Sequence, residues 1–223
     1  MPFTYAFPDP LKAGKDGLLA AGGDLSAEAL ISAYSAGIFP WYDEDSPILW
    51  WSPDPRLVLF PERFKLSATL KQTLKRKKYT VRFDHDFPAV IRNCADVQRR
   101  NQKGTWITHD MQQAYIELHQ QGYAHSVETY AGDVLAGGLY GVSLGRAFFG
   151  ESMFHHQADA SKVALYYLVE QVKKWEFHFI DAQQPTAHLK SLGAEEISRK
   201  EFLKRLQRSL EFSTRRGSWE REE

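Results

Sequence analysis

The apolar positions of this chain follow a helical spacing in some segments and alternate in others, which predicts a mixed α and β fold. Ala27, Leu30, Ile31 and Tyr34 recur three and four residues apart, as on one face of a helix, and Gly37 is placed to end it. We expect further helices after Ser67, after Pro88, around 111–118, over 161–175, before Gly193 and after Ser198.

The strand-like segments lie between these helices. Apolar residues alternate with polar ones, or run on for a few positions, in 79–83, 125–130, 134–142, 147–151 and 177–182. Two short segments of turn composition, 131–133 and 143–146, separate the second, third and fourth of them. We therefore expect three antiparallel strands in sequence, followed by a helix and one more strand.

Residues 1–57 form a different kind of region, which we expect to be a small N-terminal domain. Its stretches 38–42 and 48–56 hold three prolines and three tryptophans, and so many prolines exclude a regular helix. They predict a rigid aromatic loop, in which the tryptophans either fill a core or form a wall for a ligand. Residues 58–223 form the second domain, in which we expect a mobile tail from about residue 213.

The order of elements resembles that of acyltransferases of the GNAT type, in which two strands splay apart to hold an acyl donor. We therefore expect an α+β protein with a small N-terminal domain and a GNAT-like mixed-sheet domain. A member that uses coenzyme A would carry a glycine-containing loop at the start of the next helix, where backbone N–H groups bind pyrophosphate. The corresponding stretch, 157–163, contains no glycine, so the order of elements is present without the coenzyme A signal.

The composition is ordinary for a globular protein, but the charge is unevenly distributed. The chain has 43% hydrophobic residues, one cysteine, no signal-like start and no apolar run near the ~18 residues of a membrane span, so we expect a cytoplasmic protein. Residues 1–55 carry a net charge of −6, 56–103 of +9 and 104–223 of −3. The basic block predicts either a polyanion-binding face or a solvated helix. Its central cations are Lys71, Lys75, Arg76, Lys77 and Lys78.

Three polar residues stand where apolar segments end, and they are the candidates for chemistry. Glu151 follows Phe148-Phe149, whereas Asp181 and Gln183 follow the apolar run 177–180. Open α/β sheets place chemistry at strand ends, and burial there raises the pKa of a carboxylate and makes it a better base. Asp181 and Gln183 are two apart, so an extended segment would turn both to one face. The alternative is that each carboxylate only caps the next helix.

Other polar groups indicate no metal or nucleotide cofactor. The runs Asp84-His85-Asp86 and His155-His156 consist of adjacent residues, which point apart on a strand or helix. Cys94 has no histidine spaced to activate it and is expected to be a small buried hydrophobe. Gly137-Gly138 precedes no helix, so we expect a close backbone approach there rather than a phosphate-binding turn.

A set of motifs in one order resembles the leucyl/phenylalanyl-tRNA–protein transferases over about residues 17–210. They are Gly22–Leu25, Gly37–Trp41, Trp50–Arg56, Gly104–Thr108, His125–Glu128, Gly137–Val142, Gly150–Phe154 and Ser191–Ala194. The resemblance implies a small N-terminal domain joined to a GNAT-like domain. It also implies an enzyme that moves Leu or Phe, and Met less well, from aminoacyl-tRNA to the N-terminal Arg or Lys of a protein. That addition marks the protein for degradation and needs no cofactor.

The resemblance also implies roles for individual residues. Asp181 would orient and polarise Gln183, Gln183 would fix the attacking amine or the ester carbonyl, and Glu151 would hold the acceptor's cationic residue or the ribose. The proton of the amine would pass to a carboxylate or to the leaving ribose oxygen. Substrate-binding roles fall to Trp41, Trp106, Tyr115, Leu139, Met153, Ser161 and Leu168, with Trp41 stacking on the terminal adenine. The basic block would bind the tRNA acceptor arm. Leu139, Leu168 and the segment 184–188 depart from the family pattern, which leaves the preference among Leu, Phe and Met open.

Three other functions remain open at this stage. A GNAT acetyltransferase would use coenzyme A, but the glycine loop is missing. A transferase that builds peptidoglycan bridges from aminoacyl-tRNA shares the donor but has a longer, duplicated chain. A non-catalytic RNA-binding module is supported only by the basic block.

Overall fold

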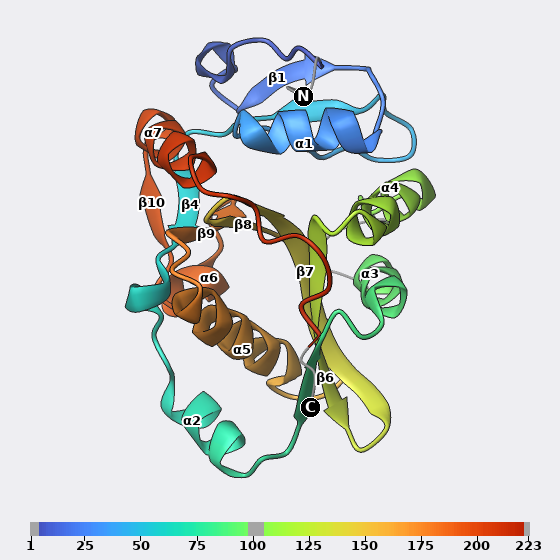
Figure 1. The fold of residues 1–223 in the computed structure, drawn as a ribbon, viewed down its shortest axis with the longest axis vertical. Helices are drawn as coiled ribbons and strands as arrows, with labels where there is room; N and C mark the ends of the chain where they lie inside the picture. The colour runs from blue at the N-terminus through green and yellow to red at the C-terminus, as the bar shows by residue number, and fades with distance from the viewer. Residues whose placement is uncertain (1–4, 98–104, 221–223) are drawn as a thin grey trace.

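The computed structural model describes residues 5–97 and 105–220 and has two sheets (Figure 1). The smaller sheet has three antiparallel strands in the order β1-β3-β2. Its elements are η1 (Pro10–Lys12), β1 (Leu18–Ala21), α1 (Ala27–Ser35), β2 (Phe39–Pro40) and β3 (Leu49–Trp51). The chain leaves this sheet after Trp51 and enters the larger one at Arg56. The domain boundary at residues 57 and 58 stays a prediction.

The larger sheet has seven strands in the order β10-β4-β9-β8-β7-β6-β5. These are β4 (Arg56–Leu59), β5 (Thr80–Phe83), β6 (Ala124–Ala131), β7 (Val134–Leu144), β8 (Ala147–His155), β9 (Phe179–Gln183) and β10 (Glu195–Ile197). β8 and β9 run parallel, whereas the other neighbouring strands run antiparallel. The expected α+β class, with a small N-terminal unit and a GNAT-like mixed sheet, is confirmed.

Helices cover both faces of the large sheet. They are η2 (Pro61–Arg63), α2 (Ala68–Lys75), α3 (Phe87–Asp96), α4 (His109–Gln120), α5 (Ala160–Lys174), α6 (Ala187–Ser191) and α7 (Arg199–Leu210). Figure 1 shows α5 on one side of the sheet and α3 and α4 on the other. The helices expected after Ser67 and Ser198 begin there, because each hydroxyl accepts a backbone N–H of the first turn, and Ser26 caps α1 in the same way.

β8 and β9 stop pairing after three positions and then diverge. A GNAT-like fold implies a splay of this kind. Their pairing ends at Phe149 and Asp181, although β8 continues to His155. Our expectation that the strand stops at Glu151 is therefore wrong. Glu151 is instead an extra residue in β8, because the register shifts between its two neighbours. Such a bulge re-aims a side chain without ending the strand.

The segment after α7 packs against the sheet, so the expected mobile tail from about residue 213 is wrong as far as residue 220. The side chain of Trp219 is 5% exposed and stacks on His125 at 3.8 Å between ring centres. The backbone N–H of Trp219 donates to Asp84 Oδ2 over 2.7 Å. The expectation failed because the buried indole anchors a segment whose neighbours, Arg215 to Gly217, have a loop-like composition.

Gly104 of one motif, and Arg99, Arg100 and Lys103 of the basic block, lie outside the described residues. Within the described ranges, no helix combines the length and the apolar character needed to cross a membrane.

Candidate functional site

A cavity of about 720 Å³ opens where β8 and β9 separate. Its apolar wall is formed mainly by β7, β8, β9 and α5, through Leu139, Phe148, Met153, Leu165, Leu168 and Ile180. Its polar wall consists of Glu151, Ser152, Asp181, Gln183, Gln184, Thr186 and His188. The N-terminal unit closes one side with Phe39, Pro40 and Trp41. A group with an apolar body and a polar, reactive end fits such a lining.

Two polar side chains of this cavity, Glu151 and Gln183, contact each other. The Gln183 side-chain amide donates to Glu151 Oε1 over 2.8 Å. On the other carboxylate oxygen, Glu151 accepts a hydrogen bond of 3.3 Å from the Tyr115 hydroxyl. The Tyr115 hydroxyl in turn shares a short hydrogen bond with that of Tyr34. Both tyrosines are fully buried, so Glu151 is fixed from the protein interior while Gln183 faces the cavity.

Burial decides the protonation behaviour of Glu151. Removal from water raises the pKa of its carboxyl from 4.5 to about 7, because the charged form loses its hydration. Hydrogen bonds from Tyr34 and Gln183 oppose this rise, and the nearby charge of Asp181 adds to it. A carboxyl with a pKa near neutrality is suited to take a proton from an amine and pass it on.

Asp181 has a different environment, although it lines the same cavity. It forms a two-point ion pair with Arg56, with Nε to Oδ1 at 2.9 Å and Nη2 to Oδ2 at 2.7 Å, and both side chains are fully buried. The Arg56 guanidinium also lies between the rings of Phe39 and Phe202 and donates to the carbonyl of Gly37. Asp181 therefore connects β9, through Arg56, with the N-terminal unit.

The backbone of Gln183 departs from a regular strand. The register of β4 and β9 shifts so that Ala182 has no partner, and Gln183 has a φ of 60°. Its backbone N–H donates to Asp181 Oδ1 over 2.9 Å. Such a conformation costs about 1–3 kcal/mol in a non-glycine residue and persists where surrounding contacts hold it. Asp181 thus holds Gln183 through the main chain, and both side chains line one cavity as expected, although the segment that joins them is not a regular strand.

Most of the predicted substrate-binding residues meet in this cavity. Trp41, Trp106, Leu139, Met153 and Leu168 line it. Tyr115 lies behind Glu151 instead of in the lining. Ser161 is buried in the first turn of α5, with its backbone close to Gly137 of β7, and does not line the cavity.

The basic residues lie apart from the cavity. Lys71 and Lys75 lie on α2, and Arg76, Lys77 and Lys78 follow it; all five are exposed. In Figure 1, α2 lies at the opposite end of the molecule from α1 and β1. Their role in tRNA binding stays a prediction.

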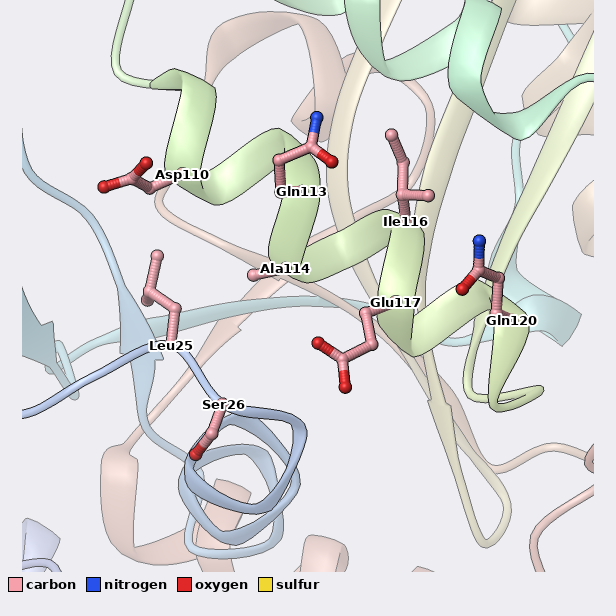
Figure 2. Close-up of a pocket in the computed structure, with 8 residues that line it drawn as sticks. All are labelled: Leu25, Ser26, Asp110, Gln113, Ala114, Ile116, Glu117 and Gln120. Carbon is pink, nitrogen blue, oxygen red and sulfur yellow. The ribbon is translucent and has the colours of Figure 1, made fainter.

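A second hollow of about 630 Å³ lies between the start of α1 and α4. Figure 2 shows Asp110, Gln113, Glu117 and Gln120 on α4, with Leu25 and Ser26 opposite. It shares no lining residue with the cavity, and it holds none of the predicted site residues. Within residues 5–97 and 105–220, no three His, Cys, Asp or Glu side chains form a group that could hold a metal ion.

Sequence reasoning missed two residues that support the site, Arg56 and Tyr34. The sequence places Tyr34 only on an apolar helix face, which its ring does occupy. The sequence did offer a clue to Arg56, which directly precedes the apolar run Leu57–Leu59. An arginine buried with such a run requires an acidic partner. The identity of that anion, 125 residues further along the chain, could not be read from local pattern.

Comparison with known proteins matches both parts of this chain to one family. The family description "Leucyl/phenylalanyl-tRNA protein transferase" matches residues 58–207, and that of its N-terminal domain matches residues 23–54. A leucyl/phenylalanyl-tRNA–protein transferase of Anaeromyxobacter sp. (strain Fw109-5) is 57% identical over 99% of this chain and 94% of its own length. Its counterpart from Legionella pneumophila (strain Corby) is 54% identical over 97% and 96%. Among solved structures, a GCN5-related N-acetyltransferase from Kribbella flavida is similar, with a TM-score of 0.39 and 9% identity over 77% of this chain and 60% of that chain.

Proposed function

Because this chain belongs to the leucyl/phenylalanyl-tRNA–protein transferase family, we propose that it moves Leu or Phe, and Met less well, to the N-terminal Arg or Lys of acceptor proteins. The donor is aminoacyl-tRNA, and the added residue marks the acceptor for degradation. A single cysteine suits a reducing, cytoplasmic setting for this reaction. The observation that carries the proposal is the Glu151–Gln183 contact, which lies between an apolar pocket and a polar wall.

The apolar wall supports an aliphatic or aromatic acyl group. Leu139, Met153 and Leu168 offer no polar partner for a substrate hydroxyl or charge. A pocket of this kind discriminates by about 1–3 kcal/mol per methylene. Leu should therefore be preferred over Ala strongly, and over Met or Phe only by degree.

The polar wall supports attack by an amine on an ester. The α-amine attacks the ester carbonyl, a C–N bond forms, and the C–O bond to the ribose breaks. Glu151 takes a proton from the amine and can return it to the departing ribose oxygen. The Gln183 amide has two N–H groups, and since one donates to Glu151, the other can donate to the carbonyl oxygen as it becomes negative.

The aromatic side of the cavity supports binding of the terminal adenosine. Trp41 is half-buried and lines the cavity. Its position is fixed because its carbonyl accepts the indole N–H of Trp51 over 2.6 Å. Adenine stacking on this ring would place the ester bond next to Glu151 and Gln183. The basic block would then bind phosphates of the acceptor arm, which position the RNA without reading its sequence.

The test is transfer from Leu-, Phe-, Met- and Ala-tRNA to a peptide that begins with Arg. We expect transfer from Leu- and Phe-tRNA, less from Met-tRNA and very little from Ala-tRNA. The same peptide with an acetylated N-terminus is the control and should accept nothing. Equal use of Ala- and Leu-tRNA would contradict the acyl pocket. Turnover of acetyl-CoA without any transfer from tRNA would replace the proposal by an acetyltransferase.

A further inference from the structure

We propose that Trp219, in the segment after α7, supports the inner wall of the acyl pocket from behind and so helps to determine which acyl group the protein transfers. It acts through Phe148, which lines the cavity. Trp219 is a positioning residue, because it does not itself belong to the lining. The inference rests on the proposed function and goes beyond it, since it gives the C-terminal segment a role in the choice of substrate.

Trp219 belongs to the same apolar cluster as the acyl pocket. Its ring centre lies 5.8 Å from that of Phe148, with an angle of 40° between the two ring planes. Aromatic rings at such a distance are in contact. The cluster that contains Trp219 also contains five residues of the apolar wall, namely Leu139, Phe148, Leu165, Leu168 and Ile180.

Phe148 is the wall residue whose position depends most directly on Trp219. Its side chain is fully buried, so it forms the closed inner end of the cavity. Its ring also packs directly on the backbone of β7, because a Cβ atom added to Gly141 would lie only 2.6 Å from it. The strand backbone blocks movement of the ring in that direction. Trp219 therefore limits how far the ring can withdraw from an acyl group in the pocket.

The indole of Trp219 is itself held on several sides. It stacks on the His125 ring at 3.8 Å and lies edge-on to Trp175 at 4.8 Å between ring centres. Its Nε1–H donates to the carbonyl of Arg215 over 3.3 Å. These contacts leave the indole little freedom, so the wall behind Phe148 is rigid.

The segment that carries Trp219 is tied to the large sheet and its connections. The Thr214 hydroxyl accepts the backbone N–H of Gly145 over 2.9 Å. The Arg216 guanidinium donates to the carbonyl of Gln121 and lies over the ring of Tyr123 at 4.4 Å. Figure 1 shows the red segment after α7 crossing the large sheet toward β5 and β6. This segment is therefore in place before any substrate enters the cavity.

A residue that only stabilises the fold gives a different result from one that shapes the pocket. Loss of stability lowers the amount of active protein and reduces transfer of every acyl group alike. A change in pocket depth instead alters the ratio between a large and a small acyl group. The ratio of Phe to Leu transfer thus separates the two roles of Trp219.

The experiment measures this ratio by competition between Phe-tRNA and Leu-tRNA for a peptide that begins with Arg. Trp219→Ala leaves a void behind Phe148, into which the ring can withdraw. The ratio should then rise about tenfold in favour of Phe, which is the lower end of the discrimination given by one methylene in an apolar pocket. Trp219→Phe retains a ring at this position and should keep the ratio close to that of the wild-type protein.

Ile91→Ala is the control for a general loss of stability. Ile91 is a fully buried residue of α3, belongs to a different apolar cluster and does not line the cavity. Its truncation also leaves a void in the core. Because that void is not behind Phe148, the ratio of Phe to Leu transfer should stay as in the wild-type protein.

A second measurement uses the intact chain, so it does not depend on the folding of Trp219→Ala. The protein is labelled with fluorotryptophan, and the fluorine NMR signal of Trp219 is assigned by its loss in Trp219→Phe. A phenylalanyl-adenosine mimic should shift this signal, because its ring reaches Phe148. The alanyl counterpart should shift it much less.

Four results would overturn the inference. They are an unchanged ratio in Trp219→Ala, an equal change in Ile91→Ala, an equal change in Trp219→Phe, and a Trp219 signal that does not respond to the phenylalanyl mimic. Any of them, together with normal transfer by the wild-type protein, would leave the proposed function standing. Absence of transfer from both Leu- and Phe-tRNA by the wild-type protein would instead contradict the proposed function.

Discussion

The side-chain amide of Gln183 donates to Glu151 over 2.8 Å and so joins two strands at the point where they have stopped pairing. The splay of β8 from β9 opens the cavity, and this single contact spans it. Glu151 is held from behind by Tyr115, and Gln183 is held through its backbone by Asp181. In the function we propose, the substrate would meet a pair of groups whose positions are set before it binds, which favours transfer.

The ion pair of Arg56 with Asp181 should be essential for stability as well as for transfer. Arg56→Met leaves a buried carboxylate without its partner and should lower the free energy of unfolding by about 3–5 kcal/mol. Replacing both residues, with Arg56→Met and Asp181→Leu, should recover much of that stability but no transfer. Arg63→Met is the control, since Arg63 pairs with Glu195 at the surface and should contribute less than about 1 kcal/mol. Denaturant unfolding checks all three, and equal losses for Arg56 and Arg63 would contradict this account.

Trp41 should contribute to binding of the adenosine. Stacking of a base on an aromatic ring is worth about 1–3 kcal/mol, so Trp41→Ala should weaken a puromycin-like mimic roughly 5- to 150-fold. The fold should persist, because Trp41 is half-buried at the cavity edge and packs edge-on against Trp51. Calorimetric titration gives the affinity, and circular dichroism checks the fold. Equal affinity of the variant and the wild-type protein would make Trp41 a packing residue only.

Leu168 should help to set the size of the acyl pocket. Leu168→Ala enlarges it and should shift the ratio of Phe to Leu transfer toward Phe, by up to about tenfold on the scale of 1–3 kcal/mol per methylene. Val172→Ala is the control, because Val172 lies one turn further along α5, is fully buried and does not line the cavity. Competition between Leu- and Phe-tRNA measures the ratio. The same shift in both variants would show that loosening of α5, not pocket size, is responsible.

The site could be predicted from the sequence only where its residues are local to a motif. Asp181, Gln183 and Glu151 were identified because each follows an apolar run, and the resemblance gave them roles. The bulge at Glu151 could not be predicted, because it depends on how β7 pairs with β8. The conformation of Gln183 likewise depends on its neighbour β4, which is far away in sequence.

For the fold, too, local features could be predicted from the sequence, whereas contacts between distant residues could not. Helix starts at Ser67 and Ser198 follow from local capping chemistry, and the structure has them as expected. Trp219 is different, because its partners Asp84 and His125 lie about 90 residues or more before it in the sequence. The composition of the segment after α7 predicts a mobile tail, but burial of the Trp219 side chain holds this segment against the sheet.

Glu128 should make stability depend on pH without affecting transfer. It is fully buried in β6, away from the cavity, and burial raises its pKa from 4.5 to about 7. The folded state therefore binds a proton that the unfolded state releases between these values, so its contribution is greatest below pH 4.5 and is lost as the pH rises through about 7. The difference amounts to about 3 kcal/mol. Unfolding of wild type and Glu128→Gln from pH 5 to 7.5 should show the variant gaining relative stability as the pH rises, and parallel curves would contradict this.

The central claim, that Glu151 takes the proton from the attacking amine, is tested most directly by the pH dependence of kcat/KM for the acceptor peptide. For the wild-type protein it should rise with pH through two ionisations, one about 7 from Glu151 and one of ~7.7–8.0 from the peptide amine. Glu151→Gln should lower the rate by about 10²–10⁴-fold, as for loss of a general base, and its residual activity should follow the amine alone. A variant that retains both ionisations, or a rate close to that of the wild-type protein, would contradict the claim.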